Sequence, residues 1–256
     1  MPNYRLLALD LDGTTLTGDN SVSKQTRHWI RYAADNGVTV IFATGRGTQT
    51  AKSFWEELRL DSPMVLVNGA EVWKSPGELL ERHVLGHDDV RRLHKLAADA
   101  GAWFWGYSTE SLTSKRNWTE EMFARDWMKF GIRHDDVAVI RRLRETVESW
   151  GTVEVTRSAP VNMEISPKGI SKETGVRAVC GLLGIDIGDV MAIGDNLNDL
   201  RLIQASGLGV AMGNADDELK RAADKLTDTN DRDGVAKAIR RYLFGLEADE
   251  TSAMHA

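Results

Sequence analysis

Two carboxylates, Asp10 and Asp12, follow a short apolar run near the start of the chain, and Gly13 comes directly after them. A continuous apolar run such as 6–9 is typical of a strand that is buried on both faces of a parallel sheet. Acidic side chains at the carboxyl end of such a strand lie where ligands bind in open α/β sheets. Two acids this close repel each other unless they share a cation. The stretch therefore indicates a functional site.

Three simpler interpretations of this stretch compete with that one. Asp-Gly favours a hairpin turn, but the residues that follow do not return as a second alternating strand. An EF-hand loop would need Gly at its sixth position and Glu at its twelfth, where this chain has Thr15 and Ser21. Surface acids without a function are the third interpretation, which this stretch alone leaves open.

Polar residues also follow three later apolar runs, at 38–43, 64–67 and 190–193. The groups after them are, in order, Thr44-Gly45-Arg46, Asn68-Gly69 and Gly194-Asp195-Asn196-Leu197-Asn198-Asp199. The carboxyl ends of parallel strands lie along one edge of a sheet, so these groups are expected to converge with the first two acids. Carboxylates gathered in this way cannot all stay ionised without a cation, and their oxygens suit Mg²⁺.

The same edge could bind a phosphate. Hydroxyl, amide and backbone N–H groups at Thr44, at Asn198 and in the glycine turns can donate to phosphoryl oxygens. Lys172 is the natural cation to complete the charge balance. Taken singly, Lys172 would be a surface residue and Thr44 a helix cap, so the argument depends on the whole set.

The elements that would position these groups alternate between strands and helices at both ends of the chain. This order predicts an α/β fold with a doubly wound, mostly parallel sheet and right-handed crossovers. Strands are expected at 6–9, 38–43, 64–67, 190–193 and 208–211, and helices at 21–36, 50–58, 172–183, 216–223 and 234–243, with another helix ending near 205.

This alternation of strands and helices is interrupted in the middle of the chain. A hairpin is expected at 71–84, helices at 88–100 and 119–130, and strands at 103–107, 153–156 and 161–165. We therefore expect a discontinuous core domain, residues 1–84 and 161–247, interrupted by a smaller α+β cap domain, residues 85–160. A disordered tail is expected at 248–256.

Composition and charge argue against several classes of protein. The 256 residues carry 32 Lys and Arg against 38 Asp and Glu, and the net charge of −6 argues against nucleic-acid binding. No apolar run approaches the roughly 18 residues of a membrane span. The N-terminus lacks the apolar segment of a signal peptide, so a cytoplasmic protein is expected. The one cysteine, Cys180, is expected in the core.

In order and spacing, the polar groups resemble the four motifs of the haloacid dehalogenase superfamily of phosphohydrolases. An α+β insert between the second and third motifs is the position of that superfamily's type 2 cap, and the pattern is most similar to the Cof-type branch. The four motifs are Asp10-Leu11-Asp12-Gly13-Thr14, Thr44-Gly45-Arg46, Gly169-Ile170-Ser171-Lys172 and Gly194-Asp195-Asn196-Leu197-Asn198-Asp199.

The resemblance implies a Mg²⁺-dependent phosphatase that hydrolyses small phosphorylated metabolites, such as sugar phosphates, through an aspartyl-phosphate. Asp10 would be the nucleophile and Asp12 the acid and base, with Lys172 as the third catalytic residue. Asp10, the backbone carbonyl of Asp12 and Asp195 would hold Mg²⁺, and Asp199 would orient Lys172 or a metal-bound water. A monomer or weak homodimer is expected. The phosphate would be bound by Leu11, Thr44, Gly45, Arg46, Lys172 and Asn198.

Three other functions stay open. A phosphotransferase or phosphomutase would share this core and cap type, and would favour cationic cap residues such as Lys115, Arg116 and Arg125. A dinucleotide-binding oxidoreductase is indicated only by Gly45-x-Gly47-x-x-Thr50, whose last position departs from the usual glycine pattern. A non-catalytic binding protein on the same fold is the third alternative, and the intact set of acids disfavours it.

Overall fold

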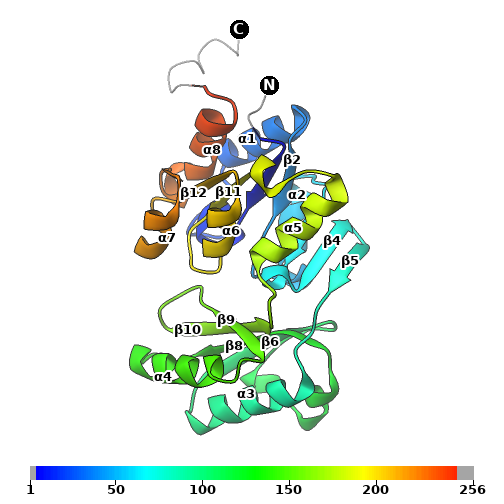
Figure 1. Cartoon of the computed structure of the whole chain (residues 1–256), viewed down its shortest axis with the longest axis vertical. Helices are drawn as coiled ribbons and strands as arrows, with labels where there is room; N and C mark the ends of the chain where they lie inside the picture. The colour runs from blue at the N-terminus through cyan, green and yellow to red at the C-terminus, as the bar shows by residue number, and fades with distance from the viewer. Residues whose placement is uncertain (1–3, 247–256) are drawn as a thin grey trace.

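A computed structural model describes residues 4–246 and divides them between two lobes (Figure 1). The larger lobe, the core domain, contains a parallel sheet with helices on both faces, and the smaller lobe, the cap, contains an antiparallel sheet. Each lobe has its own hydrophobic core. The predicted fold class, a doubly wound α/β core with an inserted α+β cap, is confirmed.

The core domain is organised around strand β1, which carries Asp10 at its carboxyl end. All four residues of β1 are buried, as expected of a strand that is covered on both faces. Leu9 lies opposite Phe42 on one side and Ile193 on the other, so three neighbouring parallel strands end at the same level. In spatial order the strands are β13 (Lys225–Leu226), β12 (Leu208–Ala211), β11 (Val190–Gly194), β1 (Leu6–Leu9) and β2 (Thr39–Phe42).

Helices cover both faces of this sheet, as right-handed crossovers require. Helix α1 packs against α8, and α5 packs against α6 on the opposite face (Figure 1). Side chains fix two of the helix starts: Ser23 caps α1, and Ser171 forms a reciprocal capping box with Thr174 in α5. The helices are α1 (Lys24–Asp35), α2 (Thr48–Glu57), α5 (Lys172–Leu183), α6 (Leu200–Ala205), α7 (Asp217–Ala222) and α8 (Gly234–Ala238).

A three-stranded antiparallel sheet extends the core domain beside β2, linked to it by one parallel bridge between Ala43 and Val65. The turn at 67–69 approaches the start of α5 very closely. Gly69 has a φ of +95°, and a Cβ there would lie 2.1 Å from the carbonyl oxygen of Ser171. This close approach brings Lys172 to the strand ends. The three strands are β3 (Met64–Leu66), β4 (Glu71–Ser75) and β5 (Glu78–Arg82).

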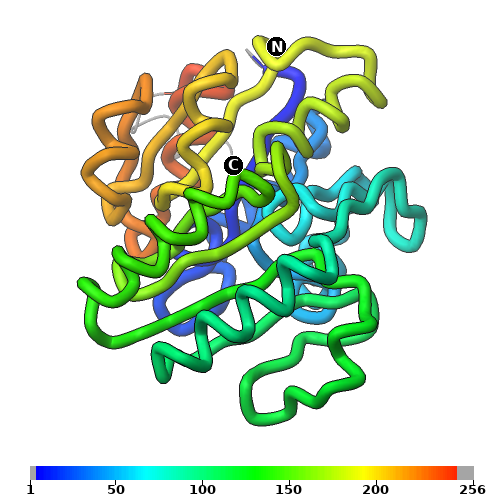
Figure 2. Tube along the Cα trace, turned by 60° about the horizontal axis from the view of Figure 1, so that its bottom comes forward, coloured from blue at the N-terminus to red at the C-terminus, as the bar shows by residue number. Residues whose placement is uncertain are grey.

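The cap is an antiparallel sheet with two helices on the face turned away from the core domain (Figure 2). Phe104, Phe130 and Ile132 pack in the cap's own hydrophobic core beneath these helices. Its strands, in spatial order, are β7 (Leu112–Ser114), β6 (Trp103–Ser108), β8 (Trp127–Arg133), β10 (Asn162–Pro167) and β9 (Val153–Thr156), and its helices are α3 (His87–Asp99) and α4 (Val137–Glu148).

Two expectations about the cap are wrong. Residues 119–130 do not form a helix, because a short turn, Glu120–Ala124, leads directly into strand β8. The first six residues of β8 are buried, and a strand covered on both faces lacks the alternation that distinguishes it from a helix. The cap also extends beyond residue 160, because β10 pairs with β8 and β9 in the cap sheet. The chain therefore returns to the core domain after Pro167.

The state of the cysteine and the hydropathy of the helices can also be compared with the expectations from sequence. Cys180 is buried and unpaired, as its apolar surroundings predict. Among residues 4–246, no helix is both long enough and apolar enough to cross a bilayer. The tail expected at 248–256 lies outside the described residues.

Candidate active site

Lys172 joins two carboxylates at the centre of the site. Its Nζ lies 2.6 Å from Oδ1 of Asp10, at the end of β1, and 2.6 Å from Oδ1 of Asp199, just before α6. All three side chains are buried. Burial alone would lower the pKa of Lys172, but the two carboxylates raise it above its usual value, so the lysine stays protonated. The second oxygen of Asp199 accepts the backbone N–H groups of Asp195 and Asn196.

Asp195, directly after β11, brings a third carboxylate to this cluster. Its Oδ1 accepts the hydroxyl of Thr14 at 3.1 Å. Gly13 lies against the other oxygen, with a φ of +75°, and a Cβ at this position would lie 2.4 Å from Oδ2 of Asp195. The turn after β1 can therefore pass beside the carboxylate only because residue 13 has no side chain.

The cluster has more negative charge than its surroundings balance. Oxygens of Asp10, Asp195 and Asp199 lie within 4.8 Å of one another, and one ammonium, that of Lys172, faces the three carboxylates. Burial raises the pKa of Asp10 well above its usual range, and the charges of the other two carboxylates add to this against the opposing lysine. Burial and the charge of Asp199 raise the pKa of Asp195 to about 7. With all three carboxylates ionised, the cluster would carry two negative charges more than the lysine balances.

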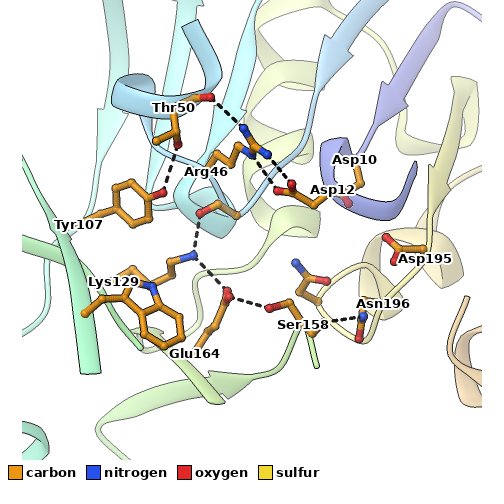
Figure 3. A pocket seen from close by; sticks show the side chains of 13 residues that line it. Asp10, Asp12, Arg46, Thr50, Tyr107, Lys129, Ser158, Glu164, Asp195 and Asn196 are labelled. Carbon is orange, nitrogen blue, oxygen red and sulfur yellow. Dashed lines mark hydrogen bonds and ion pairs between the residues drawn. The ribbon is translucent and has the colours of Figure 1, made fainter. Parts of the chain in front are cut away.

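Asp12 lies apart from this cluster and is held by Arg46 (Figure 3). The Nε and Nη2 atoms of Arg46 donate to the two carboxylate oxygens of Asp12, at 2.8 and 2.5 Å. Nη1 donates to the carbonyl of Thr50 at 3.2 Å, and the guanidinium lies 5.1 Å from the ring centre of Phe54. The hydrogen bonds to Asp12 raise the pKa of Arg46. The sequence predicts Arg46 as a phosphate ligand, whereas the structure places its charged group on Asp12.

The residues predicted to bind phosphate lie at two neighbouring strand ends. Thr44 is buried after β2, and its hydroxyl accepts the N–H of Arg46 at 3.2 Å. Asn198 donates from Nδ2 to Oδ1 of Asn68 at 3.2 Å, and its own Oδ1 is buried with no hydrogen-bond partner among the described residues. The side chain of Leu11 is buried in the hydrophobic core, so only its backbone could face a ligand.

These groups open into a cavity of about 330 Å³ between the core domain and the cap. Asp10, Asp12, Gly45, Asp195 and Asn198 reach it from the core domain. Asn196 lines the same space and donates from its side chain to the carbonyl of Ser158 at 2.7 Å (Figure 3). The remaining lining residues are Arg46, Thr50, Trp105, Tyr107, Lys129, Ser158 and Glu164.

The cap residues of this cavity are not predicted from the sequence motifs. Lys129 and Glu164 are charged, yet both lie inside strands and are buried. The sequence signal that could have found them is a charged residue inside an apolar run, because such residues are seldom buried unless they are paired. The cap cations considered for a phosphomutase lie elsewhere: Lys115 donates to the carbonyl of Ala102, and Arg125 donates to Ser111.

The sequence and fold match known proteins over almost the whole chain. The model of the haloacid dehalogenase-like hydrolase family matches residues 7–142 and 117–239. The chain belongs to this family. It is 40% identical over 242 residues to the 5-amino-6-(5-phospho-D-ribitylamino)uracil phosphatase YcsE of Bacillus subtilis, covering 94% of this chain and 97% of the relative. It is 30% identical over 262 residues to the phosphatase YitU of the same organism, which carries the same substrate in its name, covering 93% and 97%.

Solved structures agree with this family membership. A haloacid dehalogenase-like hydrolase from Bacteroides thetaiotaomicron is 28% identical, with a TM-score of 0.78 over 93% of this chain and 99% of the other. The chain is a Cof-type member of the haloacid dehalogenase superfamily and a phosphoric monoester hydrolase. The oxidoreductase alternative is therefore excluded.

Haloacid dehalogenase enzymes generally use Mg²⁺, and the residues present fit this ion. Among the described residues, the cluster offers carboxylate oxygens, as a hard cation prefers, and the two excess charges of its ionised form match a divalent ion. Both oxygens of Asp199 already accept hydrogen bonds. Asp10 and Asp195 each keep an oxygen that is not engaged by Lys172 or Thr14. These two carboxylates are therefore the side chains best placed to hold the metal.

Proposed function

We propose that this phosphatase hydrolyses phosphate monoesters of small metabolites through an aspartyl-phosphate at Asp10. The observation that carries the proposal is the placement of Asp10. Its carboxylate is buried at the end of β1, bonded to Lys172, and lines the same cavity as Asp12. A nucleophile held by a cation beside a second acid is the arrangement that two-step phosphoryl transfer requires.

The first step would form the covalent intermediate. A carboxylate oxygen of Asp10 attacks phosphorus while the bond from phosphorus to the ester oxygen breaks, and protonated Asp12 gives its proton to the leaving alkoxide. In the second step Asp12 takes a proton from the attacking water, inorganic phosphate leaves, and the Asp10 carboxylate is restored. Such acid–base assistance is typically worth about 10²–10⁴ in rate.

Other residues of the core domain would hold the phosphoryl group during both steps. Lys172 would offset the charge of Asp10 and of a phosphoryl oxygen, with Asp199 fixing its position. The backbone at Leu11 and Gly45 and the side chains of Thr44 and Asn198 would donate hydrogen bonds. Asp10, Asp195 and the Asp12 carbonyl would hold Mg²⁺, which stabilises the phosphoryl charge when bound.

Mg²⁺ affinity is expected to be about tenfold weaker at pH 6 than at pH 8, because Asp195 has a pKa of about 7 and protons compete for it below that value. The raised pKa of Asp195 also makes the free energy of unfolding depend on pH. The pKa is raised above the unfolded value, so the metal-free protein loses stability as the pH rises through 7. Calorimetric titrations at the two pH values test this, with Asp195→Asn as the control. Equal wild-type affinities would contradict it.

Arg46→Met is expected to lower kcat by about 10–100-fold with little change in KM, because it frees the carboxylate that serves as acid and base. Steady-state kinetics with an aryl phosphate test this. Arg27, which pairs with Glu57 between α1 and α2, supplies the control variant Arg27→Met. A raised KM with an unchanged kcat would instead show that Arg46 binds phosphate.

The substrate that we propose first is 5-amino-6-(5-phospho-D-ribitylamino)uracil. The relatives that are 40% and 30% identical over nearly their whole lengths carry this compound in their names. Two aromatic rings, Trp105 and Tyr107, line the cavity beside its polar groups, so it can accept both a planar ring and a polyol chain.

The test is a substrate panel measured with and without Mg²⁺. It contains this compound, ribose 5-phosphate and p-nitrophenyl phosphate. We expect Mg²⁺-dependent release of phosphate from all three, with kcat/KM for the uracil compound at least about tenfold above that for ribose 5-phosphate. Equal values would overturn the substrate proposal alone. Activity that does not depend on a divalent metal would overturn the mechanism.

A further inference from the structure

A buried ion pair of the cap reaches across the cavity to the phosphate side of the core domain. Nζ of Lys129, in β8, lies 3.1 Å from Oε2 of Glu164, in the neighbouring strand β10. The two side chains are 3% and 7% exposed. Removing two charges from water is costly unless further hydrogen bonds compensate. Both residues find those further bonds in the core domain, Lys129 at Gly45 and Glu164 at Asn68; Figure 3 shows the pair itself.

Lys129 holds the turn that follows β2. Its Nζ donates to the carbonyl of Gly45 at 2.6 Å. The carbonyl of the preceding residue, Thr44, accepts the backbone N–H of Asn68 at 2.9 Å. The backbone N–H of Val67 donates to the carbonyl of Arg46 at 2.9 Å, so all three carbonyl oxygens of residues 44–46 are occupied by donors. This matters for an anion, because free carbonyl oxygens would repel phosphoryl oxygens that the N–H and hydroxyl groups of the same turn attract.

Glu164 holds the turn that follows β3. Its Oε2 accepts Nδ2 of Asn68 at 2.7 Å, which fixes the amide so that Oδ1 accepts Nδ2 of Asn198 at 3.2 Å. Ser158 donates to the other Glu164 oxygen at 2.9 Å. A cap carboxylate thus sets the orientation of one amide, and that amide orients the next.

The surroundings of Glu164 favour its charged carboxylate. Burial by itself would raise the pKa of Glu164, but Lys129, Asn68 and Ser158 together lower it below its usual value. A charged carboxylate is a stronger acceptor for the amide of Asn68 than a neutral one, and a charged lysine holds a carbonyl more firmly than a neutral donor.

We propose that Lys129 and Glu164 are positioning residues of the phosphate site, which hold Gly45 and the Asn68–Asn198 amides in their phosphate-binding arrangement when the cap lies over the core domain. The inference rests on the proposed function, because it takes Gly45 and Asn198 as phosphate ligands. Neither charged residue needs to touch the substrate. The phosphate site would then be complete only with the cap in place.

The affinity for inorganic phosphate tests this proposal, because phosphate has no leaving group for the cap to recognise. In Lys129→Met, the inhibition constant for phosphate is expected to rise at least about tenfold at a temperature well below unfolding, since a charge-assisted hydrogen bond is lost. KM for p-nitrophenyl phosphate should rise in parallel. An inhibition constant within twofold of the wild type would overturn the proposal.

A matched control separates positioning from simple loss of stability. Arg82 pairs with buried Glu71 at 2.6 Å in the β4–β5 hairpin, and neither residue lines the cavity. Arg82→Met also removes the cationic partner of a buried carboxylate, so it should lower the melting temperature while leaving phosphate inhibition within twofold of the wild type. A tenfold loss of phosphate affinity in this control as well would show that destabilisation alone accounts for the effect, and would overturn the proposal.

A second variant is available if Lys129→Met does not fold. Asn68 has a φ of +57°, a conformation that glycine adopts freely. Asn68→Gly therefore removes the amide that links Glu164 to Asn198, with little backbone strain. It should also weaken phosphate inhibition by about tenfold. An unchanged inhibition constant for phosphate in Asn68→Gly would overturn the proposal that Glu164 acts through Asn68. A wild-type protein that hydrolyses no phosphate ester would instead refute the proposed function, so the two failures are distinguishable.

Discussion

Replacing Asp10 with asparagine is expected to abolish phosphate-ester hydrolysis, with a loss of at least about 10⁴-fold. The amide has nearly the volume of the carboxylate but is not nucleophilic, so no aspartyl-phosphate can form. The residue is buried and bonded to Lys172, and the variant also removes one charge from a cluster with two in excess. Its melting temperature in metal-free buffer should therefore be equal to or higher than that of the wild type.

The measurement combines phosphate release with thermal unfolding in EDTA. Asp99→Asn is the matched control, because Asp99 is an exposed residue of α3 paired with Lys95. That control should keep wild-type activity. An Asp10→Asn protein that retains more than about one hundredth of the wild-type rate would remove Asp10 from the role of nucleophile. An inactive protein with a sharply lower melting temperature would indicate misfolding instead.

Replacing Lys172 with methionine is expected to abolish activity and also to destabilise the fold, by about 3–5 kcal/mol in metal-free buffer. The ammonium is fully buried and serves two carboxylates at 2.6 Å. Without it, Asp10, Asp195 and Asp199 repel one another in a site with little water. Urea unfolding measures the loss, and it should be smaller at pH 5.5 than at pH 8, because protons then neutralise the stranded carboxylates.

Lys172→Arg, compared with Lys172→Met, separates the effect of the charge from the effect of the shape of the side chain. Arginine keeps the charge but presents a larger, planar group, so it should recover part of the stability and little of the activity. If Lys172→Met were as stable as the wild type at pH 8, the two buried carboxylates would not depend on the lysine for charge balance. The excess of negative charge inferred for the cluster would then be wrong.

The local sequence pattern was sufficient to predict most of the helices and strands of the core domain. Helix α5 occupies Lys172–Leu183, and β12 occupies Leu208–Ala211, the same ranges that periodicity and end signals predict. Signals at the ends mark both elements: Ser171 caps α5 and Gly184 ends it, and β12 is a short, fully buried apolar run. The central strand of the cap, β8, is covered on both faces by the cap core and by the core domain. Its sequence therefore lacks a period, and the apolar spacing of 119–130 predicts a helix where the structure has a turn and the start of β8.

The sequence by itself determined that a set of acids, a lysine and the turn proposed to bind phosphate meet at one edge of a parallel sheet. This follows because strand order and right-handed crossovers bring successive strand ends together, whatever fills the loops between them. The structure then supports the contact of Lys172 with Asp10, which are 162 residues apart.

Only the tertiary structure decided which partners complete that edge. Arg46 lies on Asp12, and Lys129 and Glu164 of the cap reach Gly45 and Asn68. Each of these contacts joins residues from different elements, and its geometry depends on how two lobes pack. Packing of this kind has no period along the chain, since buried charges are placed by the partners that satisfy them and not by their neighbours in sequence.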